Sequence, residues 1–356
     1  MIKILISGDS FFDPDIYKER INSAFGKGTL DIRTHKYEFT SPGYFIPKDT
    51  GIPSGMLMEN PTVKAAYPNC GVSEFYGEPY MLSDEIKDAE VLFIHGAALP
   101  KRVIDSAPNL KCIISMRGGP VNIDRASLKE RNIAFYNTNG KNAQAVAEFA
   151  LGSLLAFERG VAYGNSCLAD GWWWIKAADP FESHELKGKT FGLIGYGRIA
   201  RCLRKLLKGF DAKVLAYDPY VDDSVFEDEG VIKATLDELI STSDYVSLHS
   251  RAEKGDPPIM GKDRIKAMKP DAVLINSARG ALLDYKALKE ALLNKEIRGA
   301  VIDVLGSEPF GFYEDLISMR STLFTPHIAG ITKETVERGY SMGIDLLKKY
   351  ISENTK

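Results

Sequence analysis

The sequence has few cysteines, and none of them form a closely spaced pair. Its 356 residues include 4 cysteines and no C-x-x-C motif. The spacings typical of a zinc site or a redox dithiol are therefore missing. We expect free thiols in a reducing compartment, which predicts a cytoplasmic protein without a metal site.

The sequence also lacks an excess of one charge and a long apolar run. Lys and Arg number 45 against 48 Asp and Glu, a net charge of -3, so there is no basic field to hold nucleic acid or an anionic membrane. The most apolar stretch, residues 143–157, contains Glu148 and is shorter than a membrane span. The apolar run near the N-terminus is only a few residues long, ends in Gly-Asp and indicates a first strand rather than a secretory signal. We expect neither nucleic acid nor a membrane as a partner.

What is present is typical of a two-domain globular protein. Hydrophobic residues make up 44% and charged residues 26%, which is ordinary for a packed fold, and the length suits about two domains. From residue 90 onward, short β-branched runs alternate with amphipathic stretches, which predicts βαβ units and parallel sheets. The predicted strands are residues 91–94, 112–115, 134–136, 190–194, 213–217, 245–248, 272–275, 299–304 and 322–324. The predicted helices are residues 101–106, 125–131 (with Asp124 as N-cap), 142–160 and 332–352. The last six strands fit a complete doubly wound sheet.

One segment departs from this alternation. Residues 40–80 contain six prolines interleaved with glycine and aromatic residues. Because proline removes a backbone donor and fixes φ, we predict a mostly irregular segment. Irregular stretches of this length are usually functional or form a partner surface.

A glycine-rich motif follows the predicted strand 190–194. It reads G-x-G-x-x-A and opens an amphipathic helix. Gly195 allows a tight turn, Gly197 lets a pyrophosphate approach the backbone, and Ala200 permits close packing of helix on strand. The helix N-terminus offers free N–H groups to phosphate. We therefore predict a dinucleotide site that includes Gly195, Tyr196, Gly197, Arg198 and Ile199.

Asp218 ends the next predicted strand. An acid about 20 residues beyond the first glycine is placed to accept hydrogen bonds from the adenine ribose hydroxyls. Its charge would repel a 2′-phosphate, so we expect NAD rather than NADP. The alternative is that Asp218 only opens the Asp218–Pro219 turn.

Three later loops carry chemistry. N-S-A-R-G at residues 276–280, the loop at residues 303–309 and T-P-H-I-A-G at residues 325–330 each follow a predicted strand. The carboxyl ends of parallel strands share one edge of a sheet. We therefore expect Arg279, a carboxylate and His327 to face the cofactor crevice.

With these motifs in place, the chain resembles the D-isomer-specific 2-hydroxyacid dehydrogenases, the family of D-3-phosphoglycerate, glycerate and formate dehydrogenases. The resemblance runs from about residue 113 to the C-terminus. It includes G-P-V-N-I-D at residues 119–124 and N-T-N-G-K-N-A-Q-A-V-A-E at residues 137–148, besides the motifs above. It implies an NAD-dependent oxidoreductase, a homodimer, that interconverts a D-2-hydroxy acid, one that could be phosphorylated or sugar-derived, and its 2-oxo acid.

The resemblance also implies a fold with two α/β domains. Residues 138–330 would form the Rossmann-type NAD domain with its doubly wound parallel sheet. Residues 1–137 and 331–356 would together form a second, smaller, flavodoxin-like α/β substrate domain.

Catalytic roles follow from the same resemblance. Arg279 would bind the substrate carboxylate, and a guanidinium is always charged and grips a carboxylate with two hydrogen bonds; the alternative is a structural ion pair. His327 would be the general acid–base, because hydride reduction leaves an oxyanion that needs a proton. Glu308 would pair with His327 and raise the pKa of its ring.

Other positions are implied to bind ligands. His249, Ala278 and Asp303 match the cofactor side of the site, and Arg117, Gly118 and Gly119 match the substrate loop. Two features depart from the family pattern: no proline follows directly after His249, and the substrate loop reads R-G-G-P-V-N. Both departures bear on the identity of the substrate rather than on the reaction.

Clues to the substrate and to other functions leave alternatives open. The basic residues Arg117, Lys141 and Arg251 could bind a phosphate or a second carboxylate, or be solvated or contact cofactor phosphate. Residues 172–174, three tryptophans, could wall a pocket, but buried packing or a dimer interface is favoured. A regulator or corepressor that senses NAD could use the same scaffold, and so could a hydrolase of the adenosylhomocysteine type, which would not need His327.

Overall fold

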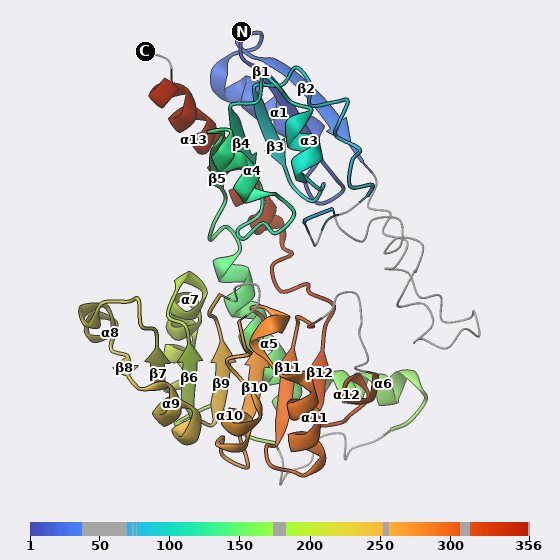
Figure 1. Cartoon of the computed structure of the whole chain (residues 1–356). Coiled ribbons are helices and arrows are strands. Elements are labelled where there is room, and N and C mark those ends of the chain that lie inside the picture. The colour runs from blue at the N-terminus through green and yellow to red at the C-terminus, as the bar shows by residue number, and fades with distance from the viewer. Residues whose placement is uncertain are drawn as a thin grey trace. The chain divides into compact units, whose positions relative to one another are not determined.

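Two compact units make up the chain. The computed structural model describes residues 1–37, 70–72, 75, 77–173, 183–251, 256–306 and 314–354. One unit joins Met1–Asn142 to Thr332–Lys356, and the other is Ala143–Ile331. Each unit has its own parallel sheet (Figure 1), which confirms the predicted fold class. Most of the proline-rich segment lies outside the described residues.

The first unit has a five-stranded sheet in the order β2-β1-β3-β4-β5. Every neighbouring pair is parallel, and this order, 2-1-3-4-5, is that of flavodoxin-like folds. The strands are β1 (Lys3–Gly8), β2 (Asp31–Lys36), β3 (Val91–Ile94), β4 (Cys112–Ser115) and β5 (Ala134–Asn137). The strands predicted at residues 91–94, 112–115 and 134–136 are confirmed.

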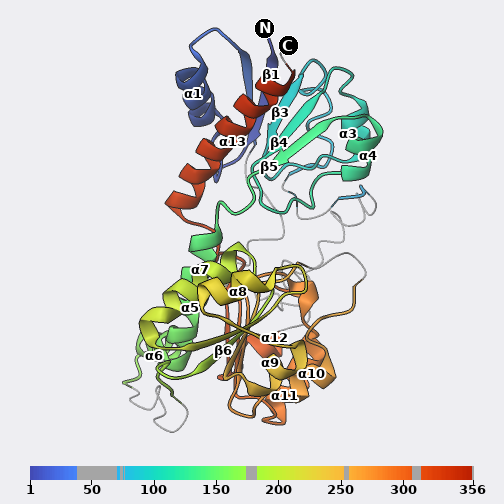
Figure 2. The ribbon, with the colours of Figure 1, turned by 90° about the vertical axis from the view of Figure 1, so that its left-hand side faces the viewer.

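Helices cover both faces of this sheet (Figure 2). One face packs against α1 (Pro14–Phe25) and α13 (Lys333–Asn354), the other against α3 (Lys101–Asp105) and α4 (Arg125–Glu130). Asp124 caps α4, as predicted, by accepting from the Ser127 N–H at 3.1 Å. The C-terminal helix α13 returns to this unit because its apolar face, with Tyr340 and Leu347, is buried against Tyr17 and Ile21 of α1.

The second unit has a seven-stranded parallel sheet in the order β12-β11-β10-β9-β6-β7-β8. Read from β8, the order is 3-2-1-4-5-6 followed by a seventh strand, which is that of a Rossmann fold. The strands are β6 (Thr190–Ile194), β7 (Lys213–Tyr217), β8 (Ile232–Lys233), β9 (Tyr245–Leu248), β10 (Val273–Asn276), β11 (Gly299–Ile302) and β12 (Thr322–Phe324). The six predicted strands are confirmed, and only the two-residue β8 is additional.

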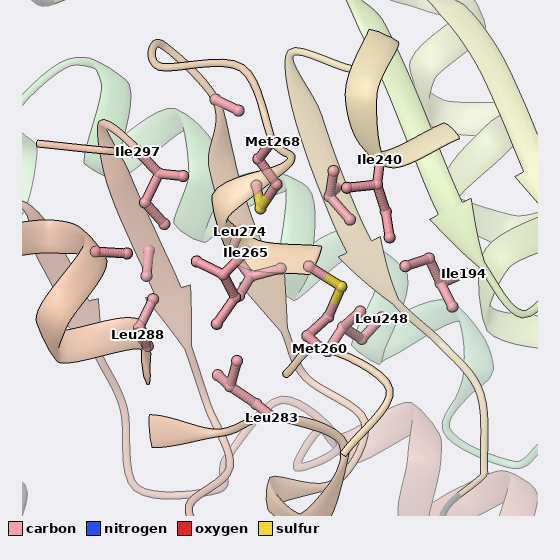
Figure 3. Packing of buried hydrophobic residues seen from close by; sticks show 14 of the residues in the cluster. Ile194, Ile240, Leu248, Met260, Ile265, Met268, Leu274, Leu283, Leu288 and Ile297 are labelled. Carbon is pink, nitrogen blue, oxygen red and sulfur yellow. The ribbon is translucent and has the colours of Figure 1, made fainter. Parts of the chain in front are cut away.

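Apolar clusters fill both faces of this second sheet. On one face, residues of α9, α10 and α11 cover the strands: Ile265 lies over Leu274, and Met260 lies beside Leu248 (Figure 3). On the other face, α5, α7 and α8 enclose a second cluster. The helices are α5 (Ala143–Glu158), α6 (Val161–Ala169), α7 (Arg198–Leu207), α8 (Asp223–Glu229), α9 (Leu236–Thr242), α10 (Lys262–Lys266), α11 (Tyr285–Leu293) and α12 (Glu314–Ile317).

The helix predicted over residues 142–160 is present as α5. Gly160 then adopts φ 60°, and the chain continues as α6. In the part of the chain that the structure describes, no helix combines the length and the apolar character needed to span a bilayer.

Candidate functional site

The first glycine of the G-x-G-x-x-A motif is required where β6 meets the loop after β9. Gly195 has φ 91°, and a Cβ there would lie 2.6 Å from the Ser250 nitrogen and 2.8 Å from the His249 carbonyl carbon. Any other residue would push these two loops apart. They lie at the carboxyl ends of β6 and β9, where the strand order reverses, the place where open α/β sheets bind ligands.

The second glycine leaves an open cradle. Gly197 is the N-cap of α7, and no side chain caps the helix. A Cβ at Gly197 would meet no heavy atom within 4 Å, so the backbone can be approached closely. Arg198 is exposed and Ile199 half-buried beside it. The uncapped helix N-terminus and the open space fit a pyrophosphate.

Tyr196 contributes its backbone rather than its side chain. The ring is 1% exposed, lies 5.1 Å from the Phe226 ring, and donates its hydroxyl to Glu229 Oε2 at 2.7 Å. Only the main chain of this predicted cofactor residue is therefore open to a ligand.

Asp218 ties the motif to the end of β7. Its Oδ2 accepts from the Tyr196 N–H at 2.8 Å and its Oδ1 from the Tyr220 N–H at 2.9 Å. Asp218 therefore does open the Asp218–Pro219 turn, as the alternative interpretation of the sequence expected. Each carboxylate oxygen can accept a second hydrogen bond, so the half-buried side chain can also accept from a ribose hydroxyl.

Three buried polar atoms at the ends of β9 and β10 have no hydrogen-bond partner among the described residues. They are His249 Nδ1, Ser250 Oγ and Ser277 Oγ. The other ring nitrogen, Nε2 of His249, lies 2.9 Å from Ser247 Oγ, and burial lowers the pKa of His249 to about 4, so the ring is neutral at pH 7. Buried polar atoms without a partner are rare and costly, and a bound ligand with polar groups would satisfy them.

Sequence reasoning predicted His249 for this edge but not the two serines. Ser277 lies inside the N-S-A-R-G motif and Ser250 directly follows His249. Their positions after strands were the signal that could have identified them.

Arg279 is held by the residue that ends β10. Asn276 Nδ2 donates to the Arg279 carbonyl at 3.0 Å, and Asn276 Oδ1 accepts from the Ala278 N–H at 3.1 Å. The guanidinium donates to the Ala278 carbonyl at 2.7 Å, and no carboxylate among the described residues pairs with it. The described residues thus give no support to the alternative of a structural ion pair.

The glycine after Arg279 brings two loops into contact. A Cβ at Gly280 would lie 1.9 Å from the Leu305 carbonyl oxygen. Only glycine lets the loop after β10 approach the loop after β11 this closely, so this glycine is a packing requirement of the N-S-A-R-G motif.

Asp303 positions the loop that carries His327. Its Oδ1 accepts from the Thr325 hydroxyl at 2.6 Å and the Ile328 N–H at 2.9 Å, and its Oδ2 accepts from the Ala329 N–H at 2.9 Å. Its carbonyl accepts from the His327 N–H at 2.8 Å. Burial raises the pKa of Asp303, and these hydrogen bonds oppose the rise without cancelling it.

His327 itself has a left-handed backbone, with φ 55°. Residues other than glycine pay for this conformation, which clusters at functional sites and persists where the surroundings enforce it. The Asp303 carboxylate supplies that enforcement. In the sheet order, Arg279, Asp303 and His327 follow three adjacent strands, β10, β11 and β12.

The predicted substrate loop lies at the end of β4 in the first unit. Arg117 Nη1 donates to Asn122 Oδ1 at 3.5 Å, and the Gly118 carbonyl accepts from Asn137 Nδ2 at 3.0 Å. Gly119 is exposed. Glu308 lies outside the described residues.

The tryptophans are not packed in the interior. Trp172 is 65% and Trp173 88% exposed, so the expectation of buried packing within the chain is wrong, while Trp174 lies outside the described residues. Trp172 lines a surface pocket beside α6 with Tyr163, Ser166, Cys167 and Asp170.

The second unit combines a sheet with the Rossmann strand order, an open glycine cradle, an arginine after β10 and a histidine after β12. This combination is typical of NAD(P)-dependent oxidoreductases. Residues 151–329 match the family model "D-isomer specific 2-hydroxyacid dehydrogenase, NAD binding domain". The chain belongs to this family. It is an oxidoreductase that acts on CH–OH groups with NAD(P) and interconverts 2-hydroxy acids and 2-oxo acids.

Several relatives are similar over most of the chain. It is 34% identical to the hydroxypyruvate reductase of Thermotoga maritima over 75% of this chain and 86% of that protein. The D-3-phosphoglycerate dehydrogenase of Methanocaldococcus jannaschii is also 34% identical, over 76% of this chain but 51% of that protein. The apo-structure of D-lactate dehydrogenase from Escherichia coli has the same fold, with a TM-score of 0.73, 22% identity, and coverage of 99% of this chain and 98% of that one.

Proposed function

We propose that the protein is an NAD-dependent D-2-hydroxyacid dehydrogenase in which His327 is the general acid–base and Arg279 binds the substrate carboxylate. The observation that carries this is the way both residues are held. Asn276 fastens the Arg279 loop, and Asp303 fastens the His327 loop in a left-handed conformation, at the ends of strands on either side of β11.

The residues present suit NAD. The main chain of residues 195–199 would hold the pyrophosphate at the N-terminus of α7, and Asp218 would accept from the adenine ribose. His249, Ala278 and the unpaired serine hydroxyls at the ends of β9 and β10 would contact the rest of the cofactor. When bound, the cofactor would accept a hydride as NAD+ or supply one as NADH. The negative charge of Asp218 favours NAD over NADP.

The side chains of this protein then have separable tasks in the reaction. Arg279 orients the 2-oxo acid through its carboxylate and stabilises negative charge that develops on the keto oxygen. His327 donates a proton to that oxygen during reduction and removes it from the hydroxyl during oxidation. Glu308 would keep the His327 ring protonated before reduction. The backbone amides of Arg117, Gly118 and Gly119 would bind the substrate.

The relatives narrow the substrate to small 2-hydroxy acids. Their names, hydroxypyruvate reductase and D-3-phosphoglycerate dehydrogenase, suggest short substrates with or without a phosphate. Nucleic acid and membranes are not among the partners we propose.

Reduction of a panel of 2-oxo acids tests this function. Hydroxypyruvate, glyoxylate, pyruvate and a phosphorylated 2-oxo acid would each be mixed with NADH or NADPH, and the 2-hydroxy product analysed for chirality. We expect oxidation of NADH with at least one acid, a D-product, and slower turnover with NADPH. Formation of an L-product or no oxidation with any acid would contradict the proposal.

We further propose that the enzyme is a homodimer that associates through α6. None of the residues of α6 is buried, and Val161, Leu168, Trp172 and Trp173 in and after it are exposed, an apolar face of the kind that marks interfaces. Sedimentation should show a dimer of the wild type and a monomer of Leu168→Glu. A wild-type monomer would refute the assignment.

A further inference from the structure

A second group of charged residues lies at the carboxyl edge of the first sheet. Asp9 follows β1, His95 follows β3, Arg117 follows β4, and Lys141 comes four residues after the end of β5. All four belong to the unit Met1–Asn142 with Thr332–Lys356. The carboxyl edge of an open parallel sheet is where such folds bind ligands.

The carboxylate in this group is already satisfied. Asp9 is 0% exposed, and its Oδ1 accepts from the N–H groups of Phe11 and Phe12 at 2.9 and 3.1 Å. Its Oδ2 accepts from the Tyr37 hydroxyl at 3.1 Å and lies 2.7 Å from His95 Nδ1. These four partners use the acceptor capacity of the carboxylate. Asp9 therefore has no acceptor position left for Lys141 or Arg117.

Lys141 is buried without a counterion. The residue is 9% exposed, and its stem passes α13 so closely that a Cβ at Gly339 would lie 3.4 Å from Lys141 Cδ and 3.6 Å from Nζ. The ammonium lies 5.8 Å from the centre of the Phe12 ring. No hydrogen-bond acceptor or carboxylate among the described residues contacts Nζ.

The ammonium nevertheless remains mostly charged at pH 7. Burial lowers the pKa of Lys141 to about 8, with a further decrease from Arg117 and an opposing effect of Asp9. A buried charge that lacks a partner costs several kcal/mol, and an anion placed against Nζ would recover that cost.

Two further hydrogen-bond donors, the Thr138 hydroxyl and the Arg117 guanidinium, lie on the Lys141 loop and on the loop beside it. Thr138 Oγ1 is buried without a partner, and the Lys141 N–H donates to the Thr138 carbonyl at 3.3 Å. The Arg117 loop rests on this segment, because a Cβ at Gly118 would lie 3.8 Å from Asn139 Cα and 3.9 Å from the Thr138 carbonyl oxygen. A hydroxyl without a partner, an ammonium without a counterion and a guanidinium are thus held by two adjoining loops.

We propose that Lys141, Thr138 and Arg117 form an anion subsite that binds a second anionic group of the substrate, a phosphate or a carboxylate, so that the enzyme prefers dianionic 2-oxo acids. This rests on the proposed function for the reaction itself. Of the interpretations left open by the sequence for Lys141, solvation does not apply, because the side chain is buried.

Direct binding tests the subsite without the reaction. Inorganic phosphate and succinate would be titrated calorimetrically into the wild type, Lys141→Met and Lys129→Met without cofactor. Methionine keeps a stem against Phe12 and Gly339, and Lys129 is an exposed lysine of the same unit. We expect Lys141→Met to weaken binding of at least one anion about 10- to 100-fold, the effect of a lost hydrogen bond to a charged group, and Lys129→Met to bind as the wild type does. Equal binding by all three proteins would overturn the subsite.

Kinetics identify which anion is recognised. The ratio of kcat/KM for 3-phosphohydroxypyruvate to that for pyruvate, and the same ratio for 2-oxoglutarate, would be compared in the same proteins. The ratio for the preferred dianion should fall at least about tenfold in Lys141→Met and stay constant in Lys129→Met. Thr138→Val, which removes only the hydroxyl, should lower it by a smaller factor and serves if Lys141→Met does not fold. Unchanged ratios in Lys141→Met and Thr138→Val would overturn the subsite.

The two proposals fail in different ways. Anion binding that depends on Lys141, in a protein that reduces no 2-oxo acid, would support the subsite and contradict the proposed reaction. Reduction of 2-oxo acids with no dependence on Lys141 would support the proposed reaction and contradict the subsite.

Discussion

Replacement of Asp303 by asparagine should loosen the loop of His327 while sparing the cofactor. The Asp303 carboxylate accepts from three donors of that loop, two on Oδ1 and one on Oδ2. Asparagine offers one acceptor oxygen, so at least one donor would face an NH2 group. A buried donor left unpaired costs about 1–3 kcal/mol.

For Asp303→Asn we expect a loss of stability in the lower half of the range of about 1–3 kcal/mol. Burial raises the pKa of Asp303 more than its hydrogen bonds lower it, so the neutral amide regains part of the desolvation cost that the carboxylate pays. We therefore expect Asp303→Asn to lower the free energy of unfolding by about 1–2 kcal/mol. Thr325→Val removes a single donor to Oδ1 and should cost about 1 kcal/mol.

The effect on turnover should be larger than the effect on cofactor binding. His327 holds φ 55° only while its loop is fastened, and each shift of about 1.4 kcal/mol toward other conformations lowers the ratio of competent to other conformations tenfold. We expect kcat of Asp303→Asn to fall by up to about tenfold, with the Kd for NADH within about twofold of the wild type.

Three measurements on the wild type, Asp303→Asn and Thr325→Val test this prediction. Urea unfolding gives the free energy of unfolding, fluorescence titration gives the Kd for NADH, and steady-state kinetics give kcat. A tenfold weaker affinity for NADH with unchanged unfolding would refute the reasoning, since Asp303 would then act on the cofactor and not on the loop.

Three further predictions concern the cofactor edge of the second unit. Asp218→Asn should raise KM for NADH about tenfold and narrow the difference between NADH and NADPH, because the charge that repels a 2′-phosphate is removed; an unchanged ratio of kcat/KM for the two cofactors would count against it. Because His249 has a pKa of about 4 in the folded protein against an ordinary value of 6.5, the unfolded chain binds the proton more readily. The free energy of unfolding should therefore be highest above pH 6.5 and fall by up to roughly 3 kcal/mol as the pH drops to 4. Urea unfolding of His249→Gln over the same pH range should show a smaller fall, which would confirm His249 as the source of the pH dependence. Gly280→Ala should lower stability by about 1–3 kcal/mol or more through the overlap with Leu305, and a calorimetric transition at the wild-type temperature would contradict the close approach.

Elements that depend on local pattern could be predicted from the sequence. The strands and the Asp124 cap follow from β-branched runs and capping chemistry that act over a few residues. The G-x-G-x-x-A motif likewise indicated the turn at Gly195, because the physical requirement and the residue coincide. The short β8 was missed since two exposed residues carry no periodic signal.

Features that depend on contacts between distant segments could not be predicted. The role of Asp303 arises where the loop after β12 folds back onto the end of β11. The sequence leaves open whether Lys141 is solvated or binds an anion, and its burial becomes visible only where α13, almost two hundred residues later, places Gly339 against its stem. For Asp218 the sequence predicts a contact with the adenine ribose, and only the structure shows that its carboxylate fastens the Tyr196 N–H.

The most direct measurement of the central claim is the turnover of His327→Asn with NADH and the best 2-oxo acid of the panel. The variant should bind NADH as tightly as the wild type and unfold at a similar urea concentration, but its kcat should fall by about 10²–10⁴, the contribution of a lost general acid. Retention of near wild-type kcat would contradict the assignment of His327 and with it the reaction mechanism proposed for this protein.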